Sequence, residues 1–310
     1  MAARGMRFGI LAAHDVVRRR ASDWTEFVRR VEGSGLDCLL LPDHLGPGLG
    51  VVAALTAAGF VSERLRLGYL VLGNDFRHPV LLAREAATID VLSGGRFELG
   101  IGAGWKESEY RSLGVDCHPA QVRIERLGES LSIIDRVWSG AGFSFTGNHY
   151  HLDDVPASLP PLQAPRPPVL VGGGGPRILS LAARRADIVS IMPRMRPGSP
   201  DGPIDPAEAT ADGFRRKIQL VRDAAGERFE HLELSLTMLH LSTDNRSVRV
   251  APGVRAWEGL SATPWGFTGS VAGAADRMRE LHARHGISYF VAMEAALDAM
   301  TRVVADLRGG

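Results

Sequence analysis

The stretch Leu92–Tyr110, LSGGRFELGIGAGWKESEY, decides the fold of this chain. A breaker cluster, Ser93-Gly94-Gly95, precedes a short apolar run from Phe97 to Ile101, and glycines then stand at every second position from 100 to 104. The apolar run predicts a strand buried on both faces, as in a parallel sheet. Alternate glycines leave one face of a strand without side chains. Either a flat ring or close packing by a neighbouring strand fills that space.

Seven further short apolar runs surround this one, and segments of helical periodicity follow them. The eight predicted strands lie near residues 8–11, 38–42, 65–71, 97–101, 169–171, 188–191, 232–236 and 287–292. Such alternation calls for a parallel sheet with helices outside. Eight units match a (β/α)8 TIM barrel. A doubly wound sheet is the alternative, but no GxGxxG motif follows the first strand.

Three insertions are expected within a single domain covering residues 1–310. The first, near 140–167, contains a predicted hairpin and a connector in which 156–168 holds six prolines. The second and third lie near 192–212 and 244–269. We expect these two loops to be mobile and to lie near the barrel mouth.

The composition is that of an ordinary soluble globular protein, with 45% apolar and 23% charged residues and a net charge of +1. This balance gives no reason to expect nucleic acid or an acidic membrane surface as a partner. No apolar run is long enough to cross a bilayer, and the start, MAARGMRFGI, is too quickly broken for a signal peptide. We therefore expect a cytoplasmic protein that acts on a small molecule.

In a barrel, the loops at the C-terminal ends of the strands build the active site. Here those loops are rich in glycine and poor in acid–base groups. No GxSxG follows a strand, no carboxylate–histidine set has metal-ligand spacing, and the two cysteines form no CxxC pair. The loops therefore suit a cofactor that brings its own chemistry, and we expect no metal site.

The run Gly172-Gly173-Gly174-Gly175, followed by Pro176, is the sharpest local signal. A strand that ends in glycines and opens a helix presents free backbone N–H groups, which bind a phosphate together with the helix dipole. The alternative is a flexible tight turn. This run follows the fifth predicted strand, whereas the commonest phosphate site of barrels follows strands seven and eight.

Four other residues are each open to two interpretations. Asp43 and His44, just past the second strand, fit a proton relay or a cofactor contact, or else a loop cap and a packed histidine. Trp105 is placed either to stack on a flat ring or to cover the barrel mouth. Arg77 either binds an anion or pairs with a nearby carboxylate, and the ion pair is the default.

Together these motifs resemble the bacterial luciferase-like superfamily, in the expected order and over nearly the whole chain from Met6. The resemblance rests on Asp43-His44, Arg77-His78-Pro79, Leu92–Arg96 with Gly100–Trp105, and Gly172–Gly175. The fourth-strand stretch is similar to the branch that uses the deazaflavin coenzyme F420. The resemblance implies a TIM barrel with insertions, usually a homodimer, with a flavin or deazaflavin across the C-terminal ends of the strands.

Carried onto this sequence, the resemblance implies that the cofactor phosphate lies on backbone amides after strand five. It also implies a non-proline cis peptide at about Leu70-Val71, behind the tricyclic ring. His44 matches a histidine beside the reactive ring carbon of some deazaflavin relatives, and it is the catalytic candidate. The implied cofactor-binding residues are Asp43, His44, Leu70, Val71, Gly102, Ala103, Gly104, Gly172, Gly173, Gly174 and Gly175, and the expected substrate pocket contains Asn74, Phe76 and Trp105.

Two departures separate the chain from the sugar-phosphate dehydrogenases of that branch. Gly48 stands where they have a tryptophan, and Trp105 stands where they have a glutamate. Their substrate is therefore not transferred. The expected activity is hydride transfer between F420 and a small organic substrate, with His44 bound to the cofactor or shuttling a proton. The alternatives are a monooxygenase that uses reduced FMN and a barrel that binds flavin without catalysis.

Overall fold

The computed structural model describes residues 5–13, 16, 18–196, 204–244 and 258–309. Eight parallel strands form a closed barrel, because each strand pairs with the next and β1 pairs with β13. The barrel strands are β1 (Arg7–Leu11), β2 (Cys38–Leu41), β3 (Arg66–Tyr69), β5 (Phe97–Gly102), β8 (Val169–Gly173), β9 (Ile188–Ile191), β10 (Glu233–Met238) and β13 (Ile287–Met293). The predicted TIM barrel is confirmed, and each predicted strand overlaps one of these.

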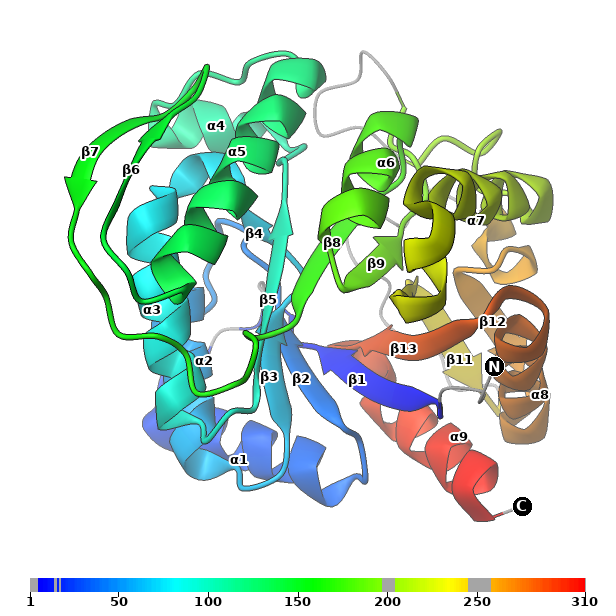
Figure 1. Cartoon of the computed structure of the whole chain (residues 1–310). Helices are drawn as coiled ribbons and strands as arrows, with labels where there is room; N and C mark the ends of the chain where they lie inside the picture. The colour runs from blue at the N-terminus through cyan, green and yellow to red at the C-terminus, as the bar shows by residue number, and fades with distance from the viewer. Residues whose placement is uncertain (1–4, 14–15, 17, 197–203, 245–257, 310) are drawn as a thin grey trace.

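Helices surround the barrel (Figure 1). They are α1 (Ala21–Gly33), α2 (Val51–Val61), α3 (Pro79–Leu92), α5 (Ala120–Trp138), α6 (Pro176–Arg185), α7 (Ala211–Ala225), α8 (Val271–His285) and α9 (Leu297–Gly309). A short extra helix, α4 (Glu107–Leu113), follows β5 and was not predicted. Within the described part of the chain, no helix is long and apolar enough to span a membrane.

Both faces of the strands are buried. Alternate residues such as Cys38, Leu40 and Leu170 belong to an apolar cluster inside the barrel. The residues between them, such as Leu39, pack in the larger core between barrel and helices. This two-sided burial explains why the strands read as continuous apolar runs rather than as an alternating pattern.

The glycines of β5 make room for an irregular crossing of the neighbouring chain. A Cβ atom on Gly100 would lie 1.7 Å from the Tyr69 carbonyl oxygen, and one on Gly102 would lie 2.7 Å from Val71 Cγ2. The Leu70-Val71 peptide between β3 and the short strand β4 (Leu72–Gly73) is cis, as the family resemblance implies. At Gly100, close packing by the neighbouring strand is therefore the correct alternative, and the expected contact of Gly102 with a cofactor stays a prediction.

The insertions lie outside the barrel. The predicted hairpin is present as β6 (Phe143–Thr146) and β7 (His151–Val155), which run antiparallel beside α5 in Figure 1. A parallel pair, β11 (His240–Thr243) and β12 (Gly266–Gly269), flanks the third insertion and was not predicted. Residues 197–203 and 245–257 fall outside the described residues, so the expected mobility of these two loops stays a prediction.

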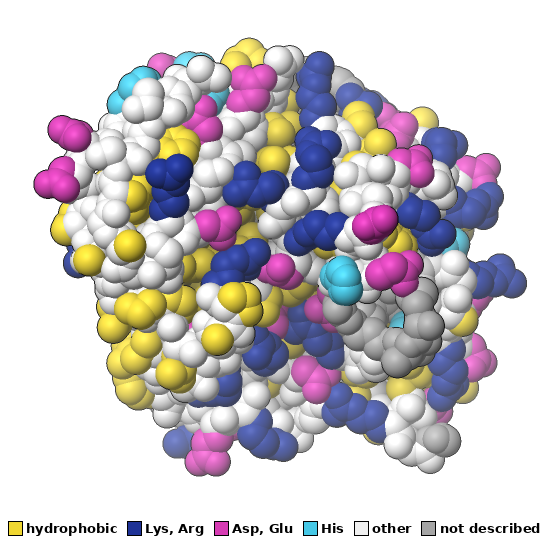
Figure 2. Space-filling view, in the orientation of Figure 1, with side chains coloured by type: hydrophobic (Ala, Val, Ile, Leu, Met, Phe, Trp, Pro, Cys, Tyr) yellow, Lys and Arg dark blue, Asp and Glu magenta, His cyan; other side chains and the backbone are white. Residues whose placement is uncertain are grey.

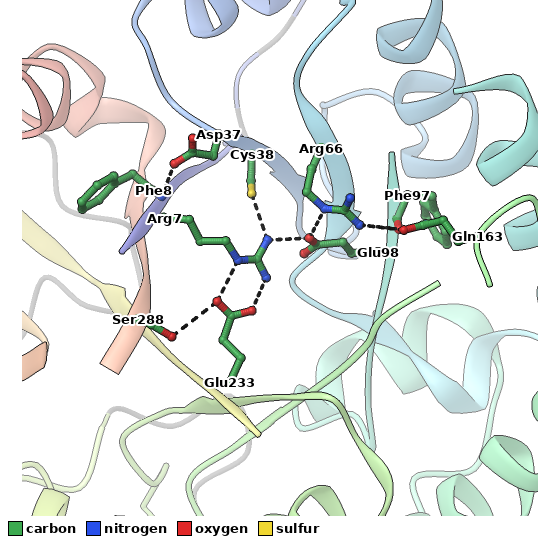
Figure 3. A network of polar contacts seen from close by, with 10 residues as sticks. All are labelled: Arg7, Phe8, Asp37, Cys38, Arg66, Phe97, Glu98, Gln163, Glu233 and Ser288. Carbon is green, nitrogen blue, oxygen red and sulfur yellow. Dashed lines mark hydrogen bonds and ion pairs between the residues drawn. The ribbon is translucent and has the colours of Figure 1, made fainter. Parts of the chain in front are cut away.

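A charged network closes the N-terminal end of the barrel (Figure 3). Arg7, at the start of β1, bonds Glu98 at 2.5 Å and Glu233 at 2.6 Å, and Arg66 bonds the same oxygen of Glu98 at 2.5 Å. The Cys38 thiol lies against Arg7, and burial raises the pKa of this thiol to about 12. This end of the barrel is thus plugged by paired side chains, and a ligand has to enter from the opposite end.

Candidate active site

His44 and Glu109 meet at the C-terminal end of the barrel. His44 follows β2, and its Nδ1 lies 3.0 Å from Glu109 Oε1 on α4. The same carboxylate accepts the backbone N–H of Leu45 at 3.0 Å and a hydrogen bond from Lys106 at 3.1 Å. The ring of Trp105 stands edge-on to His44, with 5.8 Å between ring centroids. Two loops far apart in sequence therefore build one site.

Glu109 remains ionised in this arrangement. Burial alone would raise its pKa, but hydrogen bonds from His44, Lys106 and the Leu45 N–H hold the pKa below its usual value. Since a carboxylate only accepts hydrogen bonds, His44 Nδ1 carries the proton of their shared bond. A neutral His44 therefore keeps its lone pair on Nε2. This is the arrangement of an oriented general base.

Sequence reasoning missed Glu109 because it searched the loops and treated the stretch after Gly104 as a loop. The signal was present in the same stretch. Lys106 and Glu109 are three residues apart, which is the spacing of neighbours on one helix face, and α4 begins at Glu107, directly after Lys106.

Asp43 has a structural role. Its two carboxylate oxygens lie 2.5 and 3.0 Å from the guanidinium of Arg77, and it also accepts the N–H of Gly73 at 3.0 Å. The ion pair expected for Arg77 is confirmed. Asp43 thereby ties the loop after β2 to the turn after β4, and its expected contact with a cofactor stays a prediction.

The expected pocket residues are not equivalent. Trp105 lies beside His44 and has 43% of its surface exposed. Phe76 packs on the ring of Tyr110 at a centroid distance of 4.9 Å, and Asn74 is fully buried. Trp105 is therefore the one of the three that presents a large accessible apolar surface next to His44.

The loop after β5 is held in a fixed shape. Gly104 has φ +73°, and a Cβ atom there would lie 2.1 Å from the hydroxyl of Tyr110. The Tyr110 hydroxyl lies 3.3 Å from the Ala103 carbonyl oxygen, which also accepts a 3.1 Å bond from Arg123. Only glycine suits position 104, both for its backbone conformation and for the space available. The loop can therefore present its backbone to a ligand at close range.

The run Gly172–Gly175 ends β8 and begins α6. A Cβ atom on Gly173 would lie 2.4 Å from Ile178, and one on Gly174 would lie 2.6 Å from the backbone of Pro193, so this turn is close-packed. Gly175 is the N-cap of α6, no side chain caps the helix, and no described atom lies within 4 Å of a Cβ built there. The open helix N-terminus fits a phosphate group.

The barrel occurs in known proteins. Residues 6–200 match the luciferase-like monooxygenase family.

The chain belongs to this family.

Its curated relatives include an F420-dependent glucose-6-phosphate dehydrogenase of Microbacterium testaceum, 32% identical over 190 residues, which are 59% of this chain and 55% of the relative. One of the same name from Nakamurella multipartita is 29% identical over 84% of this chain and 74% of the relative. An FMNH(2)-dependent dimethylsulfone monooxygenase of Pseudomonas putida is 31% identical over 47% of this chain and 39% of the relative. The alignment thus spans little more than half of the first relative.

Solved structures of low sequence identity share the fold. The coenzyme F420-dependent tetrahydromethanopterin reductase of Methanopyrus kandleri aligns over 99% of both chains with a TM-score of 0.77 at 16% identity. An F420-dependent secondary alcohol dehydrogenase, solved with an F420-acetone adduct, aligns over 98% of this chain and all of the other with the same TM-score and identity. At this identity the likeness shows the fold alone.

Proposed function

We propose that this chain is an oxidoreductase that transfers a hydride between coenzyme F420 and a small organic substrate. The observation that carries the proposal is the His44–Glu109 pair, set at the same barrel end as the open N-terminus of α6. His44 would act as a base and the N-terminus of α6 would bind a phosphate, and both would reach the same ligand at the C-terminal end of the barrel. Two curated relatives, from Microbacterium testaceum and Nakamurella multipartita, are named as F420-dependent enzymes, and they support the choice of cofactor.

The chain's own groups fit such a cofactor. The open N-terminus of α6 would hold its phosphate, and the fixed backbone of Ala103 and Gly104 would lie along its ring system. Leu70 and Val71, at the cis peptide, project into the barrel interior and would support the ring from below. Bound F420 supplies the carbon that accepts or donates the hydride.

His44 would handle the proton that accompanies the hydride. With Nδ1 bonded to ionised Glu109, its Nε2 can take a proton from a substrate hydroxyl or return one to a carbonyl oxygen. The Glu109 carboxylate also stabilises the imidazolium that forms when His44 takes up a proton. The mouth therefore needs no metal ion for the proton step.

Reduced-FMN-dependent oxygenation is the second candidate function, and the Pseudomonas putida relative favours it. Two assays distinguish three possibilities: F420-dependent hydride transfer, reduced-FMN-dependent oxygenation, and a barrel that binds flavin without catalysis. F420-loaded protein should change the cofactor's absorbance on adding an oxidisable alcohol or a reducible carbonyl compound, without uptake of oxygen. Oxygen uptake with reduced FMN, and no response of F420, would establish the alternative. No redox change with either cofactor would support the non-catalytic barrel.

We also propose that the chain forms a homodimer through the outer side of α2 and α3. No charged residue occurs in α2, and Phe60 on it is 70% exposed. Arg84 and Glu85 are adjacent and exposed on α3, so this face carries one charge of each sign, which is compatible with pairing against a second copy of the same face. Figure 2 shows further hydrophobic side chains at the lower left, over the connector that contains exposed Leu159.

Sedimentation velocity tests this interface. The wild-type chain should sediment as a dimer and Phe60→Asp as a monomer at the same concentration. Leu113→Asp, which places the same charge on an exposed leucine of α4, should remain a dimer. A dimeric Phe60→Asp variant would place the interface elsewhere, and a monomeric wild-type chain would refute the dimer.

A further inference from the structure

Large apolar side chains are exposed around His44. Leu45, the next residue, is 46% exposed, Leu49 in the same loop is 43% exposed, and Trp105 is 43% exposed. The Leu45 N–H bonds Glu109, and the Trp105 ring contacts His44, so these side chains belong to the two loops that meet at the pair. Leu49 lies over the ends of β1 and β2, where it borders a small hollow with Ala12. Single exposed apolar residues are ordinary, but a group at a binding site indicates an apolar ligand.

Four cations near His44 are already engaged. In the described segments 70–78 and 103–126, which include α4 and the start of α5, the half-buried arginine and lysine side chains all have partners. Arg77 pairs with Asp43, Arg126 with Asp75 at 3.0 Å, and Lys106 with Glu109. Arg123 is bonded to the carbonyl oxygens of Ala103 and Gly104. A phosphorylated substrate could recruit one of these four cations only by breaking an interaction that the cation already makes.

We infer that the substrate is an uncharged, mainly apolar molecule that packs against Trp105 and Leu45 and places one oxygen function at His44. The inference rests on the proposed function and extends it to the class of substrate. Trp105 is then a specificity-determining residue, because its exposed ring stands beside His44. A flat indole excludes water and offers apolar contact, whereas a carboxylate would bind polar hydroxyl groups.

Calorimetric titration of F420-loaded protein with a series from 2-propanol to 2-octanol, and with glucose 6-phosphate, tests the inference without relying on turnover. Each methylene buried against the rim should tighten binding about fourfold, which corresponds to about 0.8 kcal/mol. Glucose 6-phosphate should give no saturable heat. If the affinity for the alcohols does not change with their chain length, the inference is overturned. This holds even if some of the alcohols bind.

Two variants locate the effect. Trp105→Glu should reduce the gain per methylene and weaken 2-octanol binding at least tenfold, whereas Trp105→Phe should retain most of both. Because Trp105 is partly exposed, neither change threatens the core. Leu113→Glu, which adds the same charge at a 44% exposed position on α4, should bind like the wild-type chain. Equal binding by Trp105→Glu and wild type would also overturn the inference. Failure of the chain to bind F420 would instead refute the proposed function.

Discussion

Replacing Glu109 by glutamine removes the charge behind His44 and little else. Glutamine has nearly the same size, and its single carbonyl oxygen can still accept the Leu45 N–H, which lies 3.0 Å away in the wild-type chain. His44 Nδ1, also 3.0 Å away, then competes for that oxygen or faces an NH2 group. Hydrogen-bond partners that orient metal-ligating histidines typically contribute about 10–100-fold, and we apply the same range to Glu109 because it orients His44 in the same way. We therefore expect kcat to fall about 10–100-fold, which is about 1.4–2.7 kcal/mol in the barrier.

Steady-state kinetics with F420, together with a cofactor titration, measures this effect. The loss should appear in kcat, while the affinity for F420 stays at the wild-type level, because Glu109 is placed to act on His44 and not on the cofactor. Glu107→Gln is the matched control, since Glu107 is exposed on the same helix. The reasoning is refuted if Glu109→Gln keeps the wild-type kcat or if Glu107→Gln loses as much.

The same variant has a signature in acid stability. The pKa of Glu109 is lowered in the folded chain, so its ionised form stabilises the fold above the usual glutamate pKa of about 4.3. That contribution disappears as the pH falls through the folded value. The Tm of the wild-type chain should therefore fall more steeply than the Tm of Glu109→Gln as the pH drops below about 5. Parallel Tm curves would contradict the assigned pKa direction.

Three further predictions address other parts of the molecule. Gly175→Ala should leave Tm nearly unchanged, because the added methyl meets open space, yet it should weaken F420 binding several-fold in a fluorescence titration if the phosphate lies there. Arg7→Ala should lower the free energy of unfolding by about 3 kcal/mol in urea denaturation, because it leaves Glu98 buried with fewer partners. A variant as stable as the wild-type chain would contradict the role given to the charged network at the N-terminal end of the barrel. A thiol reagent near pH 8 should modify exposed Cys117 in the native chain and should spare buried Cys38, whose pKa is about 12, until the chain unfolds.

The barrel strands were predictable because burial on both faces leaves a strong mark in the sequence. A run such as Phe97–Ile101 has few polar positions, and the glycines after it signal the change to a loop. The parallel pair β11 and β12 was not predictable, since its two strands are only four residues long, with 22 residues, 244–265, between them. Pairing of this kind depends on tertiary contacts that a local pattern does not contain.

The site was predictable in part. His44 could be placed at the mouth from its position after a strand, but its partner could not be identified, because Glu109 meets it only when α4 folds against the loop after β2. The glycines of β5 left two alternatives open, since the same absence of side chains suits a ring or a neighbouring strand. The position of the Tyr69 carbonyl oxygen decided between them.

Titration of the purified chain with F420 and, separately, with FMN tests the central claim most directly. We predict saturable quenching of deazaflavin fluorescence at one site per chain, weaker binding of FMN, and weaker F420 binding by Gly175→Ala. Tight binding of FMN without binding of F420 would contradict the account.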